Sequence, residues 1–222
     1  MTNAAPRRRG RPARTARPVE ETRAAILQAA LTLFSQRGFE GAALRDIAAA
    51  AQVEHSLVRY HFSDKDTLWR AALRHLIDHM NATMGESWKA TRGQPAVDRL
   101  KRFIRDYVRY CARHPEHARI MVQEAVGEND RVAWIAEEIV RPQHRGFARL
   151  LETLMAEGTL PRVPVRSLIY ILSAAAQAPF TLAGEVKAAY GVDTATEAEI
   201  DAHAETLIAL FLRLPSSQGP IP

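Results

Sequence analysis

Residues 42–68 have the sequence AALRDIAAAAQVEHSLVRYHFSDKDTL. From Leu44 onward, apolar residues recur at i, i+3 and i+4, which predicts one apolar stripe along a short helix. Gln52 interrupts this pattern, and Glu54 begins a second short helix with an acidic residue, where the helix dipole favours one. The stretch therefore predicts two short helices joined by a tight turn, followed by a third helix that Ser63 can cap.

The second of these helices has two different faces. Val53, Leu57 and Val58 are placed to fold back onto the first helix. The outward face is rich in hydrogen-bonding side chains and carries a cation and an aromatic ring: His55, Ser56, Arg59, Tyr60 and His61. Such a pair of helices is typical of a helix-turn-helix, whose second helix enters the DNA major groove. The spacing alone fits an αα-hairpin inside an ordinary helical bundle equally well.

The order of apolar, aromatic and basic residues favours the DNA-binding interpretation. The pattern helix–turn–xxxLVRYHFxxKxxL resembles the DNA-binding domain of the TetR (tetracycline repressor) family of bacterial regulators, and the resemblance extends over residues 20–80. The matching positions are Gly38, Phe39, Ile47, Ala48, Ala51, Val53, Tyr60, His61, Phe62, Lys65 and Leu68.

Several positions depart from the family pattern. Ala42 and Ala43 stand where the family usually has Thr or Ser, so the first motif helix lacks its usual side-chain cap. Gln52 stands at the usual turn glycine, and glutamine tolerates positive φ less well than glycine. The departures at Ser56 and Arg59 indicate a different base preference.

The resemblance implies a homodimer that binds double-stranded DNA at a palindromic operator, and a C-terminal region that binds a small-molecule effector. Arg59 is the best candidate for a bidentate contact with guanine, and Lys65 is a candidate for a phosphate contact. The predicted DNA-contacting residues are Arg45, His55, Ser56, Leu57, Arg59, Tyr60, His61 and Lys65, with Arg9 and Arg11 from the N-terminal arm.

That arm concentrates the positive charge of the chain. Residues 1–18 hold six arginines and no acidic residue, whereas the formal net charge of all 222 residues is +5. Within the arm, residues 8–12 (RRGRP) resemble an AT-hook core, which lies in a narrow A·T minor groove. The alternative is a solubilising basic tail that contacts phosphates without sequence preference.

The remaining composition indicates a globular cytoplasmic protein, nucleoid-associated when bound to DNA. Hydrophobic residues make up 47% of the chain and charged residues 25%. Cys111 is the single cysteine, so no internal disulfide can form, which suits a reducing cytosol. The richest apolar run, Ser167–Ala178, is too short to span a membrane, and no apolar core follows the N-terminal arginines as in a signal peptide. We therefore expect no membrane partner.

The rest of the chain predicts an all-α fold of about nine helices. After the motif we expect helices over Asp64–Trp88, from Pro95 to the break at His114-Pro115, and over Pro115–Val126, Asp130–Glu157, Pro164–Tyr190 and Glu197–Leu214, with Glu20–Arg37 before the motif. Pro142 is expected to kink or split the helix predicted over Asp130–Glu157. The predicted organisation is a disordered arm (1–19), a DNA-binding domain (20–80), a regulatory and dimerisation domain (81–214) and a disordered tail (215–222).

Residues for catalysis or metal binding are sparse. There is no Gly-rich phosphate loop and no nucleophile elbow, so we predict no enzymatic activity and no cofactor. His75 and His79, at i and i+4, have the spacing of a metal-binding pair, but two histidines alone are more often solvent-facing. We predict no metal site.

An effector pocket is predicted between the helices of residues 95–190. Its candidate lining residues combine aromatic rings with a few polar groups: Phe103, Tyr107, Trp134, His144, Phe147, Tyr170 and Gln177. The alternative is that these residues are plain core. Of the set, Gln177, His144 and Tyr107 are the polar groups for which an apolar bundle has little other use.

The last two helices are predicted to form the dimer. Pro164–Tyr190 is apolar around almost its whole circumference, and Glu197–Leu214 has a second apolar stripe. Two such helices from each subunit form a four-helix bundle across a two-fold axis. The predicted interface residues are Ile169, Leu172, Ala176, Leu207 and Phe211. The alternative is that they close the core of a single chain.

Together these features predict a one-component transcriptional regulator, most simply a repressor released from its operator by a small molecule. A competing hypothesis is a DNA-architectural protein that binds A·T-rich DNA through the arginine-rich arm. A helical enzyme is disfavoured because the catalytic constellation is missing.

Overall fold

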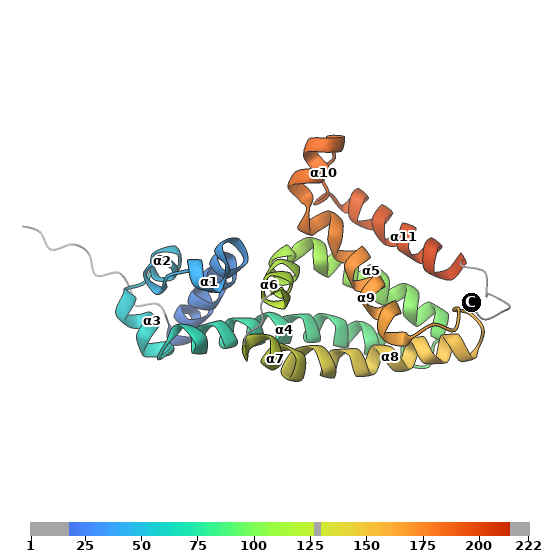
Figure 1. Ribbon diagram of the computed structural model, residues 1–222, viewed down its shortest axis with the longest axis horizontal. Helices are drawn as coiled ribbons and strands as arrows, with labels where there is room; N and C mark the ends of the chain where they lie inside the picture. The colour runs from blue at the N-terminus through green and yellow to red at the C-terminus, as the bar shows by residue number, and fades with distance from the viewer. Residues whose placement is uncertain (1–17, 127–129, 214–222) are drawn as a thin grey trace, which may run out of the picture.

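The computed structural model describes residues 18–126 and 130–213, and every regular element in these ranges is a helix (Figure 1). This confirms the all-α class. The helices are α1 (Val19–Gly41), α2 (Leu44–Ala50), α3 (His55–His61), α4 (Lys65–Ala90), α5 (Ala96–Arg113), α6 (Pro115–Ala125), α7 (Asp130–Ile135), a π-helical turn (Ala136–Val140), α8 (Arg141–Ala156), α9 (Val165–Thr181), α10 (Ala183–Tyr190) and α11 (Glu197–Arg213).

Two of the predicted helices are divided in the structure. The stretch expected to run from Asp130 to Glu157 contains the π-helical turn immediately before Pro142. Proline has no backbone N–H and its ring crowds the carbonyl four residues earlier, and the wider π turn accommodates both effects. The stretch expected from Pro164 to Tyr190 is bent by 65° between α9 and α10.

A cross-helix hydrogen bond accompanies the second bend. Pro179, inside α9, cannot donate to the carbonyl of Ala175 four residues earlier. His203 of α11 supplies the missing donor, because its Nε2 lies 2.9 Å from that carbonyl oxygen. The hydrogen bond therefore ties α11 to α9 at the point where the proline interrupts the α9 ladder.

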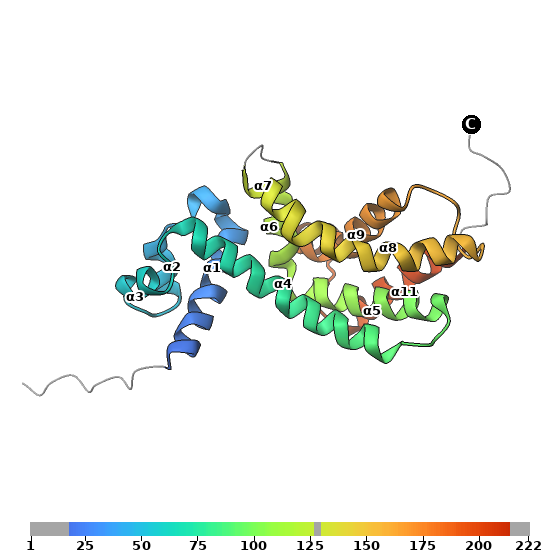
Figure 2. The same cartoon turned by 90° about the horizontal axis from the view of Figure 1, so that it is seen from below.

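The long helix α4 connects the two parts of the molecule. Helices α1–α3 surround its N-terminal end, and its C-terminal part runs into the second bundle (Figures 1 and 2). There α5 packs against α4, α8, α9 and α11. The inner face of α4 is buried along its length, with Leu68, Trp69, Leu73, Leu76 and Met80 in the core. A single helix thus spans from the α1–α3 unit to the interior of the second bundle (Figure 1).

Aromatic rings and arginines join α1–α4 to the second bundle. Trp69 of α4 is fully buried, with the Phe39 ring edge-on at 6.2 Å and the Trp134 ring at 5.6 Å between centroids. The Arg131 guanidinium lies over Phe39 at 3.9 Å. Gln123 of α6 also donates a hydrogen bond of 3.1 Å to the α1 backbone. These contacts place α6 and α7 directly against α1 and the N-terminal part of α4.

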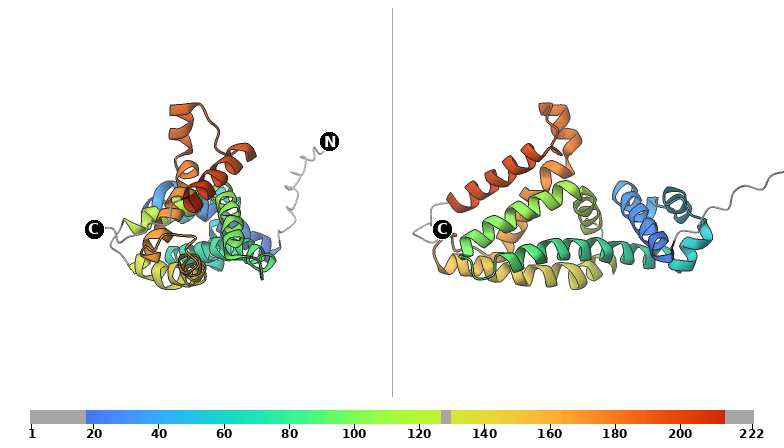
Figure 3. Two further views of the ribbon diagram at one scale, coloured as in Figure 1. Left: turned by 90° about the vertical axis from the view of Figure 1, so that its right-hand side faces the viewer. Right: turned by 180° about the vertical axis from the view of Figure 1, so that it is seen from behind.

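Helix α11 lies along α5, at the side of the second bundle away from α8 (Figure 3). Three arginines at every fourth position of α5, Arg105, Arg109 and Arg113, pair with acidic residues of α11. The ion pairs are exposed, so each contributes little free energy, but together they fix the register of the two helices.

Within the described residues, no single helix has both the length and the hydropathy of a membrane span. The bent pair α9–α10, taken as one segment, is long and apolar enough for a membrane span by length and composition alone.

Candidate nucleic-acid interface and effector cavity

The turn between α2 and α3 is a Schellman motif with glutamine at its left-handed position. Gln52 has φ +57°, the value for which the family uses glycine. The Val53 amide donates to the Ala48 carbonyl at 3.0 Å, and the Gln52 amide donates to Ala49 at 3.1 Å. The departure from the family therefore keeps the turn geometry and places a strained residue in it.

Helix α3 is held by two apolar residues and presents the rest of its surface to solvent. Val58 and Phe62 are buried. On the outer face, Ser56, Arg59 and Tyr60 are exposed, and the Tyr60 side chain is 79% accessible. Leu57 was expected to pack onto α2, but it is 39% exposed. Because α3 has only seven residues, a single buried residue, Val58, anchors it and Leu57 falls on the solvent side.

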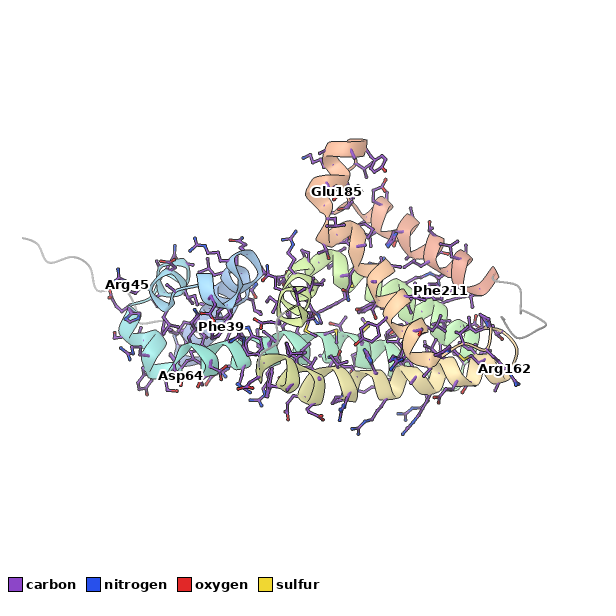
Figure 4. The ribbon with its side chains drawn as sticks, viewed as in Figure 1. Phe39, Arg45, Asp64, Arg162, Glu185 and Phe211 are labelled. Atoms are coloured by element: carbon purple, nitrogen blue, oxygen red, sulfur yellow. The ribbon has the colours of Figure 1, made fainter. Side chains whose placement is uncertain are left out.

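The remaining residues of the predicted recognition face lie beside this surface. His55 and His61 are half-buried, and the His61 ring packs edge-on against Tyr60 with 5.3 Å between centroids. Arg45, near the start of α2, is exposed at the end of the molecule remote from α8 and α11 (Figure 4). Basic, aromatic and hydrogen-bonding groups therefore share one end of the structure.

Helix α2 starts without a side-chain cap, because its N-cap residue is Ala43. Its position is fixed instead by an ion pair between Arg37 of α1 and Asp46, whose Nη1 and Oδ2 atoms lie 2.7 Å apart. Arg37 therefore links α1 to α2.

The N-terminus of α4 is capped by Asp64, and not by Ser63 as predicted. The Thr67 amide donates to Asp64 Oδ1 at 2.7 Å. This hydrogen bond lowers the pKa of the Asp64 carboxyl below its usual value. Asp64 is one residue closer to the first helical turn, which gives its carboxylate the N-cap geometry.

Lys65 makes contacts within the chain. Its Nζ donates to the Glu40 carbonyl at 3.1 Å and lies 4.6 Å from the centre of the Phe39 ring. Lys65 therefore closes the C-terminal end of α1, where the Gly38 bend (φ +70°) leaves backbone carbonyls without helical partners. The predicted arm residues Arg9 and Arg11 lie outside the described residues.

Comparison with known proteins agrees with this geometry. Residues 26–72 match the family model described as bacterial regulatory proteins of the tetR family, and residues 73–217 match the C-terminal region of YcdC-like proteins. The chain belongs to the TetR family. Its α2–turn–α3 unit is the helix-turn-helix of a DNA-binding transcriptional regulator, as the sequence predicted.

Three relatives of this TetR-family chain illustrate the match. It is 42% identical over 85 residues to the HTH-type transcriptional repressor Rv3405c of Mycobacterium tuberculosis, spanning 38% of this chain and 45% of that protein. It is 29% identical over 185 residues to the HTH-type transcriptional regulator RutR of Escherichia coli K12, covering 79% and 81%. A solved TetR-like transcriptional regulator from Rhodococcus sp. RHA1 has a TM-score of 0.63 at 20% identity, covering 89% and 96%. The relatives are regulators, and none indicates catalytic activity.

The second bundle of this TetR-family chain contains a cavity of about 150 Å³. It is bounded by α4, α5, α8 and α9. Four of the seven residues predicted to line an effector pocket surround it: Phe103, Tyr107, His144 and Phe147. Gln177 lies behind them and donates a hydrogen bond of 2.5 Å to the Tyr107 hydroxyl.

Two of the predicted pocket residues lie elsewhere. Trp134 packs against Trp69 and under Arg70 and Arg74, at the junction with the DNA-binding unit. Tyr170 is exposed and its ring contacts His144 from outside the cavity. Aromatic content alone does not distinguish a cavity wall from a packed junction or a surface ring.

Seven cavity residues were not predicted to line the pocket. Ile169 and Leu172 were assigned to the dimer interface, and the other five are Met80, Asn81, Met84, Gln143 and Ser173. A usable signal was present, because Gln143 is four residues before Phe147 and Ser173 is four before Gln177. Residues at i and i+4 share a helix face, so each polar residue lies on the face of a residue already chosen.

The five residues predicted for the dimer interface are buried within the single chain. Ile169, Leu172, Ala176, Leu207 and Phe211 are each less than one-tenth exposed. The apolar stripes of α9 and α11 face the core of the chain itself, and Phe211 labels this inner side of α11 in Figure 4. The residues left on the outside of these helices are different ones.

The other singled-out side chains have local partners. Burial raises the pKa of the Cys111 thiol to about 12, so this thiol stays protonated and unreactive. The His79 ring packs against His114 with 5.0 Å between centroids. No cluster of three metal-ligating side chains occurs in the part of the chain that the structure describes.

Proposed function

We propose that this chain is a repressor that binds a palindromic operator as a homodimer and is released by a small molecule. The exposed polar face of α3, held by buried Val58 and Phe62 at the end of the molecule, is the observation that carries the proposal. A short helix that buries one apolar side and presents donors and acceptors on the other fits the major groove. Rv3405c, the relative with 42% identity, is itself named a repressor.

The α3 surface supports a mixed recognition of bases. Arg59 is exposed, and its planar guanidinium suits a bidentate contact with the O6 and N7 atoms of guanine. The exposed Leu57 adds an apolar surface, which suits the methyl group of thymine. Ser56 and Tyr60 add hydrogen-bonding groups for bases or phosphates.

The test begins by selecting the binding site from random or genomic DNA and mapping the protected bases. A palindromic regulator protects one short dyad, whereas an architectural protein covers A·T-rich DNA broadly. Arg59→Ala should then weaken binding to the selected site by about 1–3 kcal/mol, with a far smaller loss on random DNA. The matched control is Arg162→Ala, an exposed arginine at the far end of the molecule (Figure 4). Equal losses on both DNAs would show that Arg59 contacts only phosphate.

The arginine-rich arm adds a second proposed contact. Arg9 and Arg11 are proposed to lie in the minor groove beside the operator, where a narrow groove attracts arginine. Deleting residues 1–18 should weaken DNA binding and reduce its dependence on salt, because fewer counterions are released. If the deletion left the salt dependence unchanged, the arm would not contact DNA in the complex.

The dimer is proposed to form through the outer faces of α9 and α11. Both faces carry small or apolar residues in helical register, and small residues let helices approach closely. A two-fold axis beside them brings four helices together. The exposed positions are Ile171, Ala174 and Ala178 on α9, and Ala202, Thr206 and Leu210 on α11.

Arginine substitutions on this face test the dimer. Ala178 is exposed in the single chain, so Ala178→Arg should leave the fold intact, convert the protein to a monomer by light scattering and abolish binding to the dyad. The control is Ala82→Arg, at an exposed position of α4. Leu207→Glu should instead unfold the chain, because Leu207 is core. A dimeric Ala178→Arg protein would place the interface elsewhere.

A further inference from the structure

We infer that the effector is an uncharged single-ring molecule with a hydrogen-bond acceptor, held between α4, α5, α8 and α9 in the 150 Å³ cavity. The inference rests on the proposed function, because it names the chemical class of the molecule that the proposed repressor detects. Size, charge, ring surfaces and one unsatisfied donor each restrict the ligand independently.

The volume limits the ligand to about one ring. An engineered protein cavity of about 150 Å³ takes up benzene, and the cavity here has the same volume. A long acyl chain does not fit this space without moving the surrounding helices. Asn81 is exposed where it lines the cavity, so the cavity reaches the surface there.

The lining favours an uncharged ligand. None of the eleven residues around the cavity is Lys, Arg, Asp or Glu. His144, the one titratable imidazole among them, has its pKa lowered by burial and is neutral at pH 7. A carboxylate entering the cavity would lose its hydration without gaining a cation, which is strongly unfavourable.

The walls favour a flat ring. Phe103 stacks on Phe147 with 4.2 Å between centroids and lies 5.7 Å from the Tyr107 ring. The thioethers of Met80 and Met84 face the cavity from α4, and sulfur makes favourable contacts with ring edges. Aromatic and thioether walls therefore offer both stacking and edge contacts to a planar ligand.

One buried donor indicates where the acceptor of the ligand lies. The Nε2 atom of Gln143 is buried without a hydrogen-bond partner among the described residues. Buried polar groups are normally satisfied, so an unsatisfied donor lining a cavity points to a bound acceptor. The Tyr107 hydroxyl of the wall is already engaged, because it bonds to Gln177 and Ser173.

The larger hollow of the molecule has a different setting. It measures about 300 Å³ and lies among α9, α10 and α11. Its lining includes Ala202 and Thr206, which belong to the proposed dimer face, and the acidic Glu199. We assign it to the region beside the interface, so the 150 Å³ cavity remains the proposed effector site.

Three probes of one shape separate charge from hydrogen bonding. Benzamide is neutral with an acceptor, benzoate is anionic, and cumene has neither charge nor acceptor. Calorimetric titration of the full chain should show benzamide binding at least about tenfold more tightly than benzoate. Decanoate tests the acyl-chain alternative. Tighter binding of benzoate or decanoate than of benzamide would overturn the inference, as would no binding of benzamide up to its solubility limit.

Two variants tie binding to this cavity. Gln143→Leu removes the donor at nearly constant size, so it should lower the ratio of benzamide to cumene affinity by about three- to tenfold. Ser173→Leu fills the cavity and should abolish the binding of both probes. Gln28→Leu makes the same chemical change at an exposed position of α1 and should alter neither. Benzamide affinity that is unchanged in Ser173→Leu would place the site elsewhere.

A separate measurement of DNA binding distinguishes a failure of the inferred ligand class from a failure of the proposed repressor function. If benzamide binds in the cavity but leaves the selected DNA bound, the ligand class stands and release by the ligand fails. If the chain binds no DNA, the repressor proposal fails while the cavity titrations still decide the ligand class.

Discussion

Acidification should destabilise this protein through one histidine, His117, in the first turn of α6. A ring nitrogen of His117 (Nδ1) lies 3.0 Å from the Tyr110 hydroxyl. Burial lowers the pKa of the imidazole from 6.5 to about 4, and the charge on neighbouring His114 acts in the same direction. His114 itself contacts Glu116, whose carboxylate is 3.1 Å away. The His117 ring is therefore held neutral in the folded chain at pH 7.

The sign and size of the effect follow from the two pKa values. Between pH 6.5 and about 4 the unfolded chain binds the proton more readily than the folded chain, so stability falls as pH falls through this window. The His117 contribution is fully present above pH 6.5. A shift from 6.5 to about 4 corresponds to a loss of about 2 kcal/mol on going from pH 7 to pH 5. For a chain of this length that loss lowers the Tm by roughly 4–8 °C.

The assay is urea unfolding at pH 7, 6 and 5 for the wild-type chain and for His117→Gln. Glutamine keeps a hydrogen-bonding group near Tyr110 but does not titrate, so the variant should lose less stability than the wild type over the same range. His75→Gln changes an exposed histidine and should leave the pH dependence unaltered. Identical slopes for wild type and His117→Gln would refute the reasoning, because they would mean that His117 accepts a proton without unfolding.

Three further substitutions test local features. Gln52→Gly should raise the free energy of unfolding by up to about 1 kcal/mol, since glycine carries little strain at φ +57°. A lower free energy of unfolding would show that the glutamine side chain contributes more stability than the strain removes. Lys65→Met should lower it by about 1 kcal/mol, because the Glu40 carbonyl loses its donor, while the salt slope of DNA binding stays constant. A shallower slope would mean that Lys65 contacts phosphate in the complex. Trp134→Leu should cost about 1–2 kcal/mol by removing the ring against Trp69, and unchanged unfolding would contradict this packing.

The helix-turn-helix was predictable from the sequence because its constraints are local. Apolar spacing, the interrupted pattern at Gln52 and the Tyr60–Phe62 segment each act within one or two helical turns. The corrections there are small ones: the cap moved from Ser63 to Asp64, and Leu57 turned outward. Such shifts of one residue or one side-chain direction depend on the exact start of a helix, which sequence patterns define poorly.

The cavity and the interface depend on contacts between distant segments, so the sequence constrains them less. Trp134 and Phe103 are both aromatic residues in helices, yet only Phe103 faces the cavity, because Trp134 lies on α7, nine residues before Gln143, the first cavity residue of α8. Ile169 and Leu207 lie on the strongest stripes of α9 and α11, but a strong stripe is what a chain buries first in its own core. The surface left for a second chain consists of weaker, smaller residues such as Ala178.

The position of α4 relates the proposed effector site to the proposed DNA site. Met80 lines the cavity and Lys65 begins the helix, fifteen residues away, a distance of about 22 Å along an α-helix. Over that length a tilt of about 5° displaces the α4 N-terminus by roughly 2 Å. Lys65 holds the end of α1, and the α4 N-terminus follows directly after α3, so α3 moves with it.

A displacement of that size is sufficient to break the recognition of DNA. Hydrogen bonds to base edges weaken steeply beyond about 3.2 Å, and two recognition helices must stay about 34 Å apart to contact successive major grooves. A ring bound in the cavity contacts Met80 and Met84 of α4. Because the rest of the bundle interior is close-packed, any adjustment of these residues to the ring is passed on to α4 and its neighbours. The buried contact of Trp69 with Phe39 and Trp134 lies on this path, about one helical turn after Lys65. If the proposed function holds, we expect a small neutral ligand to weaken operator binding by changing the separation of the two α3 helices of a dimer, without unfolding either of them.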